Sequence, residues 1–381
     1  MWYNVGMIYL DHAAATPVDA RVLRAMEPYF GEKFYNPSAA YLPAKKVSAD
    51  YEVAKAKIAH CIGAKGADLV ITAGATEANN LAFTAPTSKV LYLETEHDSV
   101  RRVAQQYGGM AVRVLANGLV DMADLRAKLT DEVEMISVSL ANNELGVIQP
   151  LAEIAALVRE VRMDRMRRGI KRQLLLHSDA SQALNLLDVN VARLGVDLLT
   201  LNSAKVYGPK GVGALYVAHG VKLLPLTLGG GQENGLRSGT ENVPGVVGFA
   251  RAMELAHEHV NGNRKKYAGW RKILLDELEG HELINRKHCL DNFVVVCYEG
   301  LDAERLVFAL EERGVYVATG AACAASKGVR SHVLSAIGLS EAQIAGSLRL
   351  TLGETNDEAQ IHEAAAIINE VVAAERKRMG A

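Results

Sequence analysis

The sequence predicts an α/β protein that has a mostly parallel central sheet and a second, smaller α+β domain. Short apolar runs alternate with helical patterns through the first part of the chain, which is typical of a parallel sheet covered on both faces. After about residue 245 a long helical stretch and shorter mixed elements follow. We therefore expect a large domain over residues 16–245 and a small domain formed by residues 1–15 and 246–381.

Six short apolar runs predict the buried strands of the large domain. The runs that predict them are DLVIT (68–72), KVLYLE (89–94), MISVSL (135–140), QLLLHSD (173–179), DLLTLN (197–202) and GALYVA (213–218). A small-residue turn and a helix are expected after the first of these runs.

The smaller domain should begin with a long helix that links it to the larger one. Its expected elements are a helix over 246–278, a strand over 291–298, a helix over 302–314, strands over 315–320 and 347–352, and an amphipathic C-terminal helix.

Composition excludes several classes of protein. The chain has 381 residues, a net charge of −2, 49% hydrophobic and 23% charged residues, which is ordinary globular composition without a basic field for nucleic acid. No apolar run reaches the roughly 20 residues that span a bilayer, and the first residues lack a secretory pattern. Its cysteines are Cys61, Cys289, Cys297 and Cys323. Without CxxC spacing they predict a reducing, cytoplasmic protein with no structural metal.

One segment, residues 159–173, is strongly basic. It could bind an acidic partner or nucleic acid. The composition favours the solvated end of a helix and a charged turn before the next strand.

A lysine, Lys205, follows the strand expected over 197–202 and precedes a glycine-rich loop. Most lysines in such turns are simply solvated. A lysine at the carboxyl end of a strand can also hold an aldehyde cofactor as a Schiff base. Residues elsewhere in the chain must decide between these two interpretations.

Other strand ends carry groups that suit such a cofactor. Asp179 ends a buried strand, where a carboxylate is costly unless paired, and a protonated pyridine nitrogen is one partner; a helix cap at Asp179 or Ser181 is the alternative. His97 also follows a strand and could stack on a ring or move protons, although a lone histidine is more often structural. Thr76 lies at a helix start, which is either an anion site or a plain N-cap.

The segment 229–242, GGGQENGLRSGTEN, is a glycine-rich loop that contains Arg237, Ser238 and Thr240. Such a loop can wrap an anion with backbone amides and one guanidinium. A glycine run alone is a weak signal, but it becomes informative beside the lysine and the aspartate.

With these residues in place, the chain resembles the cysteine desulfurases of the class V aminotransferase group. The matching stretches include IYLDHAAATPVD, YNPSAAY, TAGATEANNLA, ANNELGVIQPL, HSDASQ, KVYGPKGVGALYV, GGGQENGLRSGTEN, ATGAACAAS, SHVLSAIGL and SLRLTLGETN, in the family's order from residue 8 to about 356. The resemblance implies a fold-type-I architecture, a pyridoxal 5'-phosphate cofactor, L-cysteine as substrate and a homodimer.

The resemblance also implies roles for individual residues. Lys205 would form the Schiff base, Asp179 would pair with the pyridinium nitrogen, Gln182 would bond the ring hydroxyl, and His97 would stack on the ring. The residues implied at the cofactor phosphate are Ala75, Thr76, Asn202, Ser203 and Thr240, the last from the second subunit.

At the substrate, the resemblance places Asn143 near both cofactor and substrate and pairs Arg349 with the substrate carboxylate. Cys323 would be the nucleophile that takes the sulfur, and its small-residue surroundings, TGAACAASKG, predict a surface loop. The length of this loop resembles the group that hands sulfur to an iron–sulfur scaffold or a tRNA-thiolation enzyme.

The chain departs from the family's pattern beside the lysine. Ala204 stands where a histidine that touches the phosphate is usual, and Asn202, Tyr41 and Ala321 replace a frequent serine, histidine and serine. These departures put phosphate affinity in doubt. The resulting hypothesis is an L-cysteine desulfurase, with a selenocysteine lyase, a class V aminotransferase or a non-catalytic binding scaffold as alternatives.

Overall fold

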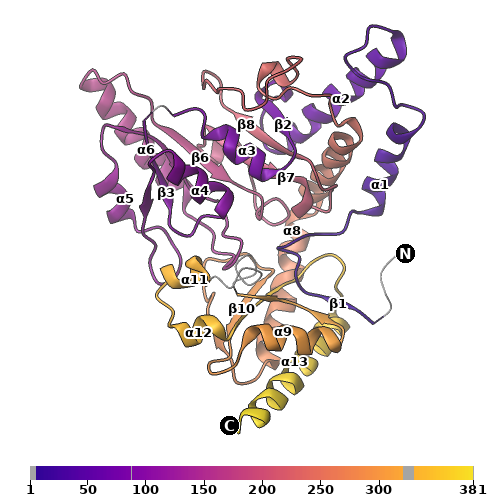
Figure 1. Ribbon diagram of the computed structural model, residues 1–381, viewed down its shortest axis with the longest axis vertical. Coiled ribbons are helices and arrows are strands. Elements are labelled where there is room, and N and C mark those ends of the chain that lie inside the picture. The colour runs from indigo at the N-terminus through magenta and orange to yellow at the C-terminus, as the bar shows by residue number, and fades with distance from the viewer. Residues whose placement is uncertain (1–5, 87, 321–329, 381) are drawn as a thin grey trace.

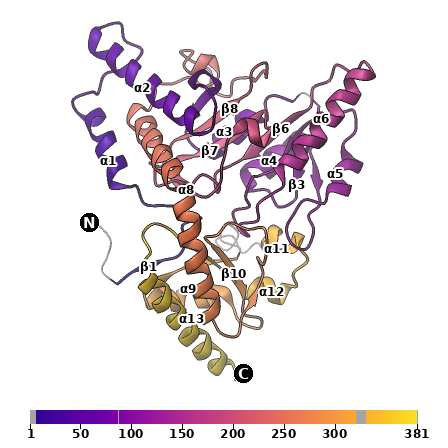
Figure 2. The ribbon, with the colours of Figure 1, turned by 180° about the vertical axis from the view of Figure 1, so that it is seen from behind.

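The computed structural model describes residues 6–86, 88–320 and 330–380. A larger upper body and a smaller lower body are joined by one long helix, α8 (Val243–Glu277) (Figure 1; Figure 2). The segment containing Cys323 lies outside the described residues.

Within the described residues, seven strands of the upper body form one sheet in the order β2-β8-β7-β6-β5-β3-β4. Their bounds are β2 Leu69–Thr72, β3 Lys89–Leu93, β4 Met110–Val112, β5 Val133–Ser137, β6 Leu175–Asp179, β7 Leu198–Asn202 and β8 Gly213–Val217. Strands β4, β3, β5, β6 and β7 are parallel, whereas β8 is antiparallel to both of its neighbours. The predicted mostly parallel sheet is confirmed.

Burial explains why these runs form strands. Every residue of β2, β5 and β6 is buried, as expected for a sheet with both faces covered. The covering helices include α3 Ala75–Ala82, α4 Asp98–Gln106, α5 Met122–Lys128, α6 Leu151–Arg167 and α7 Val191–Leu194, while α1 Ala20–Met26 and α2 Leu42–Cys61 pack against α8. Because β6 and β7 are parallel neighbours, their carboxyl ends meet at one edge of the sheet, where open α/β sheets place their ligands.

The lower body has, in the described part of the chain, an antiparallel sheet in the order β12-β13-β10-β9 and a parallel pair, β1 and β11. The bounds are β1 Ile8–Tyr9, β9 Glu282–Leu283, β10 Phe293–Cys297, β11 Val315–Tyr316, β12 Ala318–Thr319 and β13 Ser347–Thr351; the helices are α9 Ala303–Glu312, α11 His332–Ala336, α12 Glu341–Ala345 and α13 Glu358–Met379. The single strand predicted over 315–320 is split, because its first part pairs with β1 and its second with β13.

Three hydrophobic clusters form the core of the described chain, and two of them are large. The first joins the sheet of the upper body to its helices and includes Val246 and Phe249 of α8. The second joins β1, β10, β13 and α13 and includes Tyr267 and Leu274 of α8. The domain boundaries at residues 15 and 245 stay a prediction. No helix among the described residues is both long enough and apolar enough to cross a membrane.

Candidate active site

A cavity of about 420 Å³ opens at the carboxyl edge of the large sheet, and residues of both bodies line it. Its lining consists of Asp11, Ala13, Ala14, Ala75, Thr76, His97, Ser99, Ser139, Ala141, Asn143, Asp179, Ser181, Gln182, Asn202, Lys205 and Arg349. The fold thus brings together most of the residues expected at the site from distant parts of the chain. Ser203 and Thr240 are not among the lining residues.

Lys205 ends a short 3-10 turn, Ser203–Lys205, directly after β7. Its Nζ donates to the carbonyl of Ala13 at 2.8 Å and also to that of Ala14. Its own carbonyl accepts from Asn185 Nδ2 at 2.7 Å, which fixes the backbone below the amine. The amine therefore lies in the cavity, at the strand end predicted for it.

Asp179, the last residue of β6, is held by two donors. Its Oδ2 accepts from Asn79 Nδ2 at 2.9 Å, and its Oδ1 accepts from the Ser181 amide at 2.9 Å. The second bond closes a local turn, and no helix of the described chain begins at Asp179 or Ser181, so the alternative of a helix cap is wrong, while the pairing with a ring nitrogen stays a prediction. With 8% of its surface exposed, the carboxylate is nearly buried and has donors rather than a charged partner around it.

His97 and Asp179 lie at opposite ends of one hydrogen-bond chain. Asn79 Nδ2 also donates to Ser99 Oγ at 2.9 Å, and Ser99 Oγ lies 2.8 Å from His97 Nδ1. The Ser99 amide donates to the same Nδ1, so His97 is the N-cap of α4. Asn79 and Ser99 were missed from the sequence, because nothing in a periodic helix pattern shows which polar side chains meet across the fold.

The start of α3 faces the cavity. The helix begins at Ala75 with Gly74 as its N-cap, so the alternative of an N-cap at Thr76 is wrong. Gly74 has φ 145°, and a Cβ on Gly213 would lie 2.8 Å from its Cα, so both positions require glycine. First-turn amides of a helix have no partner within the helix, so these amides and the Thr76 hydroxyl are donors of the kind that bind anions, and a phosphate there stays a prediction.

The turn before Lys205 differs from expectation at one residue. Asn202 lines the cavity, and its Oδ1 accepts from the Ala204 amide at 3.1 Å. Ser203 is fully buried, and its Oγ has no hydrogen-bond partner among the described residues. A Cβ on Gly208 would lie 2.2 Å from that oxygen, so the Ser203 hydroxyl points at Gly208. The structure does not bring it to the cavity.

Arg349, on β13, supplies the cationic end of the cavity. Its Nη1 donates to the carbonyl of Asn143 at 2.9 Å, and its Nη2 donates to Asp11 Oδ1 at 2.6 Å. Its Nε has no partner among the described residues. Asp11 was missed from the sequence, although its place in the IYLDHAAAT stretch was the available signal.

The glycine-rich loop is anchored by Glu233. This buried carboxylate pairs with Lys55 Nζ at 2.9 Å, and it accepts from Tyr51 at 2.5 Å and from the Ile71 amide at 2.8 Å. Thr240, farther along the loop, is exposed. The anchor fixes the loop while leaving Thr240 on the surface.

The described cysteines make poor nucleophiles. Cys61 and Cys297 are buried, and burial raises the pKa of both thiols to about 11. Cys289 is half-buried, and burial also raises its pKa. The position of Cys323 stays a prediction, but β12, shortly before it, pairs with β13 at the Ala318–Arg349 register position.

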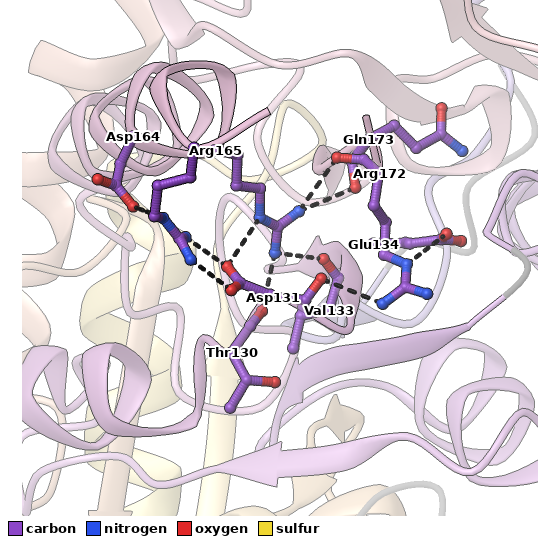
Figure 3. Close-up of polar contacts among 9 residues, drawn as sticks. Thr130, Asp131, Val133, Glu134, Asp164, Arg165, Arg172 and Gln173 are labelled. Carbon is purple, nitrogen blue, oxygen red and sulfur yellow. Dashed lines mark hydrogen bonds and ion pairs between the residues drawn. The ribbon is translucent and has the colours of Figure 1, made fainter. Parts of the chain in front are cut away.

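The basic segment 159–173 is largely engaged within the fold. Arg165 is 2% exposed, and its guanidinium donates to the carbonyls of Thr130 and Val133, both at 2.8 Å, and of Gln173 (Figure 3). Further ion pairs of the segment join Arg162 to Asp197, Arg168 to Asp131 and Arg172 to Glu134. The expectation of a solvated helix end is therefore wrong for Arg165, which ties α6 to the start of β5.

The chain is similar to cysteine desulfurases over nearly its whole length. A family model described as Aminotransferase class-V matches residues 8–363. Cysteine desulfurase IscS 1 of Archaeoglobus fulgidus is 37% identical over an alignment of 375 positions that covers 93% of this chain and 94% of the relative. Cysteine desulfurase IscS of Dictyoglomus turgidum is 36% identical over an alignment of 363 positions that covers 91% of this chain and 89% of the relative.

Solved structures agree in fold. A NifS-like protein matches with a TM-score of 0.87 and 30% identity, over 97% of this chain and 100% of that one. SspA in complex with cysteine matches with a TM-score of 0.78 and 31% identity, over 91% of this chain and 98% of that one. The chain therefore belongs to the class-V aminotransferase family and, within it, to the cysteine desulfurases.

Proposed function

We propose that this protein is a pyridoxal-phosphate-dependent L-cysteine desulfurase that converts L-cysteine to L-alanine and moves the sulfur onto Cys323. The observation that carries the proposal is the convergence of Lys205, Asp179 and Arg349 on one cavity. The amine of Lys205 suits the aldehyde of the cofactor, and the buried carboxylate of Asp179 suits its ring nitrogen. The guanidinium of Arg349 suits the carboxylate of an amino acid. The relatives named as cysteine desulfurases support the same reaction.

The residues present fit the cofactor. The Asp179 carboxylate and the α3 amides with Thr76 offer separate sites for a cationic ring nitrogen and an anionic phosphate. The Lys205 amine also reaches the cavity, whose 420 Å³ volume is in the range of small-molecule sites. Bound there, the cofactor would supply an electron sink for charge that develops at the substrate Cα.

Each side chain then has a defined task. Asp179, oriented by Asn79 and by the Ser181 amide, holds a proton at the ring nitrogen. Lys205 anchors the cofactor and moves the proton of the substrate Cα. Gln182 donates one amide proton to the carbonyl of Ala13 at 3.0 Å and keeps its Oε1 for the ring hydroxyl.

Arg349 binds the substrate carboxylate. Asp11 and the Asn143 carbonyl hold its guanidinium, and each of them takes one N–H, from Nη2 and Nη1 respectively, so that a second N–H on each of these nitrogens remains for the substrate. This preorganisation reduces the entropy lost when the substrate binds. It also fixes the orientation of the amino acid in the cavity.

The sulfur transfer balances without a further reactant. L-cysteine and the Cys323 thiol become L-alanine and a Cys323 persulfide. The carbon–sulfur bond of the substrate breaks and a carbon–hydrogen bond replaces it, so the substrate carbon gains two electrons. The two sulfurs that form the sulfur–sulfur bond, one from the substrate and one from Cys323, each give up one of these two electrons.

A second copy of the chain is the proposed structural partner. Leu224, Leu226 and Leu228 are exposed at alternate positions just before the glycine-rich loop, and an apolar stripe of this kind supports a protein interface. A homodimer through this face would carry Thr240 to the phosphate of the other subunit. Further proposed partners are a sulfur acceptor, either an iron–sulfur scaffold or a tRNA-thiolation enzyme, in a reducing cytoplasm.

The test uses the holoenzyme and its Cys323→Ser variant. The variant should keep its cofactor and still change its absorbance when L-cysteine is added, because Lys205, Asp179 and Arg349 are intact. Alanine and persulfide formation should be lost. The control, Cys289→Ser, should behave as the wild type. Extra sulfur found by mass spectrometry on Cys61, Cys289 or Cys297 would contradict the assignment.

A further inference from the structure

The first turn of α11 is tied to the upper body by a buried hydrogen bond. Ser331, the N-cap of α11, accepts from the Leu334 amide at 3.0 Å and donates to Glu144 Oε2 at 2.5 Å. Ser331 is 1% exposed and Glu144 is 7% exposed. A buried carboxylate is costly to place, so a glutamate here calls for an explanation.

The next residue makes a second link. His332 Nε2 lies 2.9 Å from the carbonyl oxygen of Glu96. Because a carbonyl only accepts, this nitrogen carries the proton and donates. We call Ser331, His332, Glu144 and the Glu96 carbonyl the α11 clasp.

Apolar packing supports the clasp. Val333 and Leu334 of α11 are buried in the hydrophobic cluster of the upper body, although the preceding described strand, β12, belongs to the lower body. Helix α11 accordingly lies where the two bodies meet (Figure 1; Figure 2). The chain that leaves β12 therefore has its far end fixed to the other body.

Both acceptors of the clasp adjoin the cavity. Glu144 directly follows Asn143, whose carbonyl holds Arg349, and Glu96 directly precedes His97. Ser331, in turn, lies shortly after Cys323 in the chain. The clasp thus connects residues next to the substrate and cofactor groups with the chain that carries the proposed nucleophile.

We propose that Glu144 is a positioning residue for the transfer of sulfur to Cys323, because through Ser331 it fixes one end of the chain segment that carries this thiol. The inference rests on the proposed function and adds a residue to it. Glu144 itself is not a lining residue of the cavity, so it acts through Ser331 rather than on the substrate.

The charge of Glu144 predicts a pH dependence of sulfur transfer, which a purely structural contact would not produce. Burial raises its pKa to about 7, opposed by the Ser331 hydrogen bond and by Arg349, while Asp98 adds to the rise. Below that pH the Ser331 hydroxyl loses an ionised acceptor, and such bonds are the stronger kind. Sulfur transfer should therefore decline as the pH falls through about 7, and a neutral side chain should remove this component.

The experiment compares single-turnover persulfide formation on Cys323 in the wild-type holoenzyme, in Glu144→Gln and in Ser331→Ala. Both variants should transfer sulfur about tenfold to a hundredfold more slowly, since small misplacement of a reacting group costs this much. Their KM for L-cysteine and the absorbance change that precedes transfer should stay at wild-type values. In Glu144→Gln the rate of sulfur transfer should also lose its pH dependence near 7. Titration of the Cys323 thiol affects the wild type and this variant equally, so it does not account for the difference.

Two matched controls separate the clasp from general effects on the fold. Ser340→Ala removes the N-cap of the neighbouring helix α12, where Ser340 bonds the Gln343 amide. Glu94→Gln neutralises a nearby glutamate that accepts from the Val114 amide. Neither control should alter the transfer rate. Ser331→Thr keeps the hydroxyl and should therefore transfer sulfur at the wild-type rate, unlike Ser331→Ala.

Hydrogen exchange at the Leu334 amide adds a readout that needs no turnover. It should quicken in Glu144→Gln and in Ser331→Ala, and the double variant should add little to either single one. If Glu144→Gln keeps the wild-type transfer rate and pH profile, the positioning role is overturned, but the proposed function is not. Absence of persulfide in the wild type would overturn the proposed function and this role with it.

Discussion

Asp179 receives a hydrogen bond at 2.9 Å from Asn79, a residue one hundred positions earlier in the chain. The same amide nitrogen donates to Ser99 at 2.9 Å, which links Asp179 to His97. One buried asparagine therefore orients two of the residues proposed to hold the cofactor ring.

Replacing Asn79 with alanine should weaken cofactor binding. Loss of a hydrogen bond to a charged group costs about 1.5–3 kcal/mol, and the Ser181 amide still holds the other oxygen, so we expect about a tenfold lower affinity for pyridoxal phosphate. Titration of the stripped protein measures this. Asn80→Ala is the control, because among the described residues the Asn80 side chain donates to the carbonyl of Thr76 on its own helix and not to the cofactor site. Equal affinities in both variants would contradict the role of Asn79.

Borohydride reduction of the holoenzyme, followed by peptide mapping, should place the cofactor on Lys205. The alternative amine, Lys210, donates to the carbonyl of Thr16 at 2.5 Å and does not line the cavity. Lys205→Ala should abolish turnover and the label. A label on Lys210 would refute the assignment.

The departures beside Lys205 lead to a graded series of variants. Asn202→Ala should weaken cofactor binding, because Asn202 lines the cavity and caps the turn through the Ala204 amide. Ser203→Ala should leave it unchanged, because the Ser203 hydroxyl is buried away from the cavity. Ala204→His should strengthen it, with about 1.5–3 kcal/mol as the ceiling for one added bond to a charged group. Weaker binding in Ser203→Ala, measured by the same titration, would disprove the assigned direction of that hydroxyl.

The Lys55–Glu233 pair should matter for stability. Both side chains are nearly buried, with 6% and 5% exposed, and removal of one member of a buried pair costs about 3–5 kcal/mol. Glu233→Gln should therefore lower the free energy of unfolding by roughly this amount in chemical denaturation. Lys57→Met, which breaks the exposed pair of Lys57 with Glu254, should cost about 1 kcal/mol or less. Similar losses in the two variants would show that Glu233 is not an anchor.

Stability should fall at acid pH partly through His12. Burial is the main cause that lowers its pKa from 6.5 to about 4, so the folded protein holds it neutral. Between these values the unfolded chain binds more protons, and stability rises with pH. About 3 kcal/mol is present above pH 6.5 and lost as the pH falls to 4. His12→Gln should flatten this part of the curve of unfolding free energy against pH. If the curves of the wild type and the variant coincide at acid pH, His12 is not the source of the loss.

Much of the fold follows from local pattern, and the exceptions have physical causes. Continuous apolar runs predicted strands such as β6 and β7 to within two residues at each end. The three-residue strand β4 was missed, because it is short, lies at the sheet edge and is only partly buried. The split of 315–320 between two sheets depends on partners distant in sequence.

At the site, the residues at strand ends were predictable because parallel strands finish at one edge. Asn79 and Glu144 were not, since each acts through a partner at long sequence separation, and for Asp11 the only signal was its place in the IYLDHAAAT stretch. The direction of the Ser203 hydroxyl was equally hidden, because it depends on the close approach of Gly208.

Helix α8, 35 residues and about 50 Å long by its rise per residue, contributes side chains to both large hydrophobic clusters. Neither cluster can come apart without exposing part of a helix that the other one still holds. Heat or denaturant should therefore melt the two bodies together in one cooperative transition, instead of leaving one folded beside the other. In this protein the two sides of the cavity, one from each body, persist or disappear as a unit.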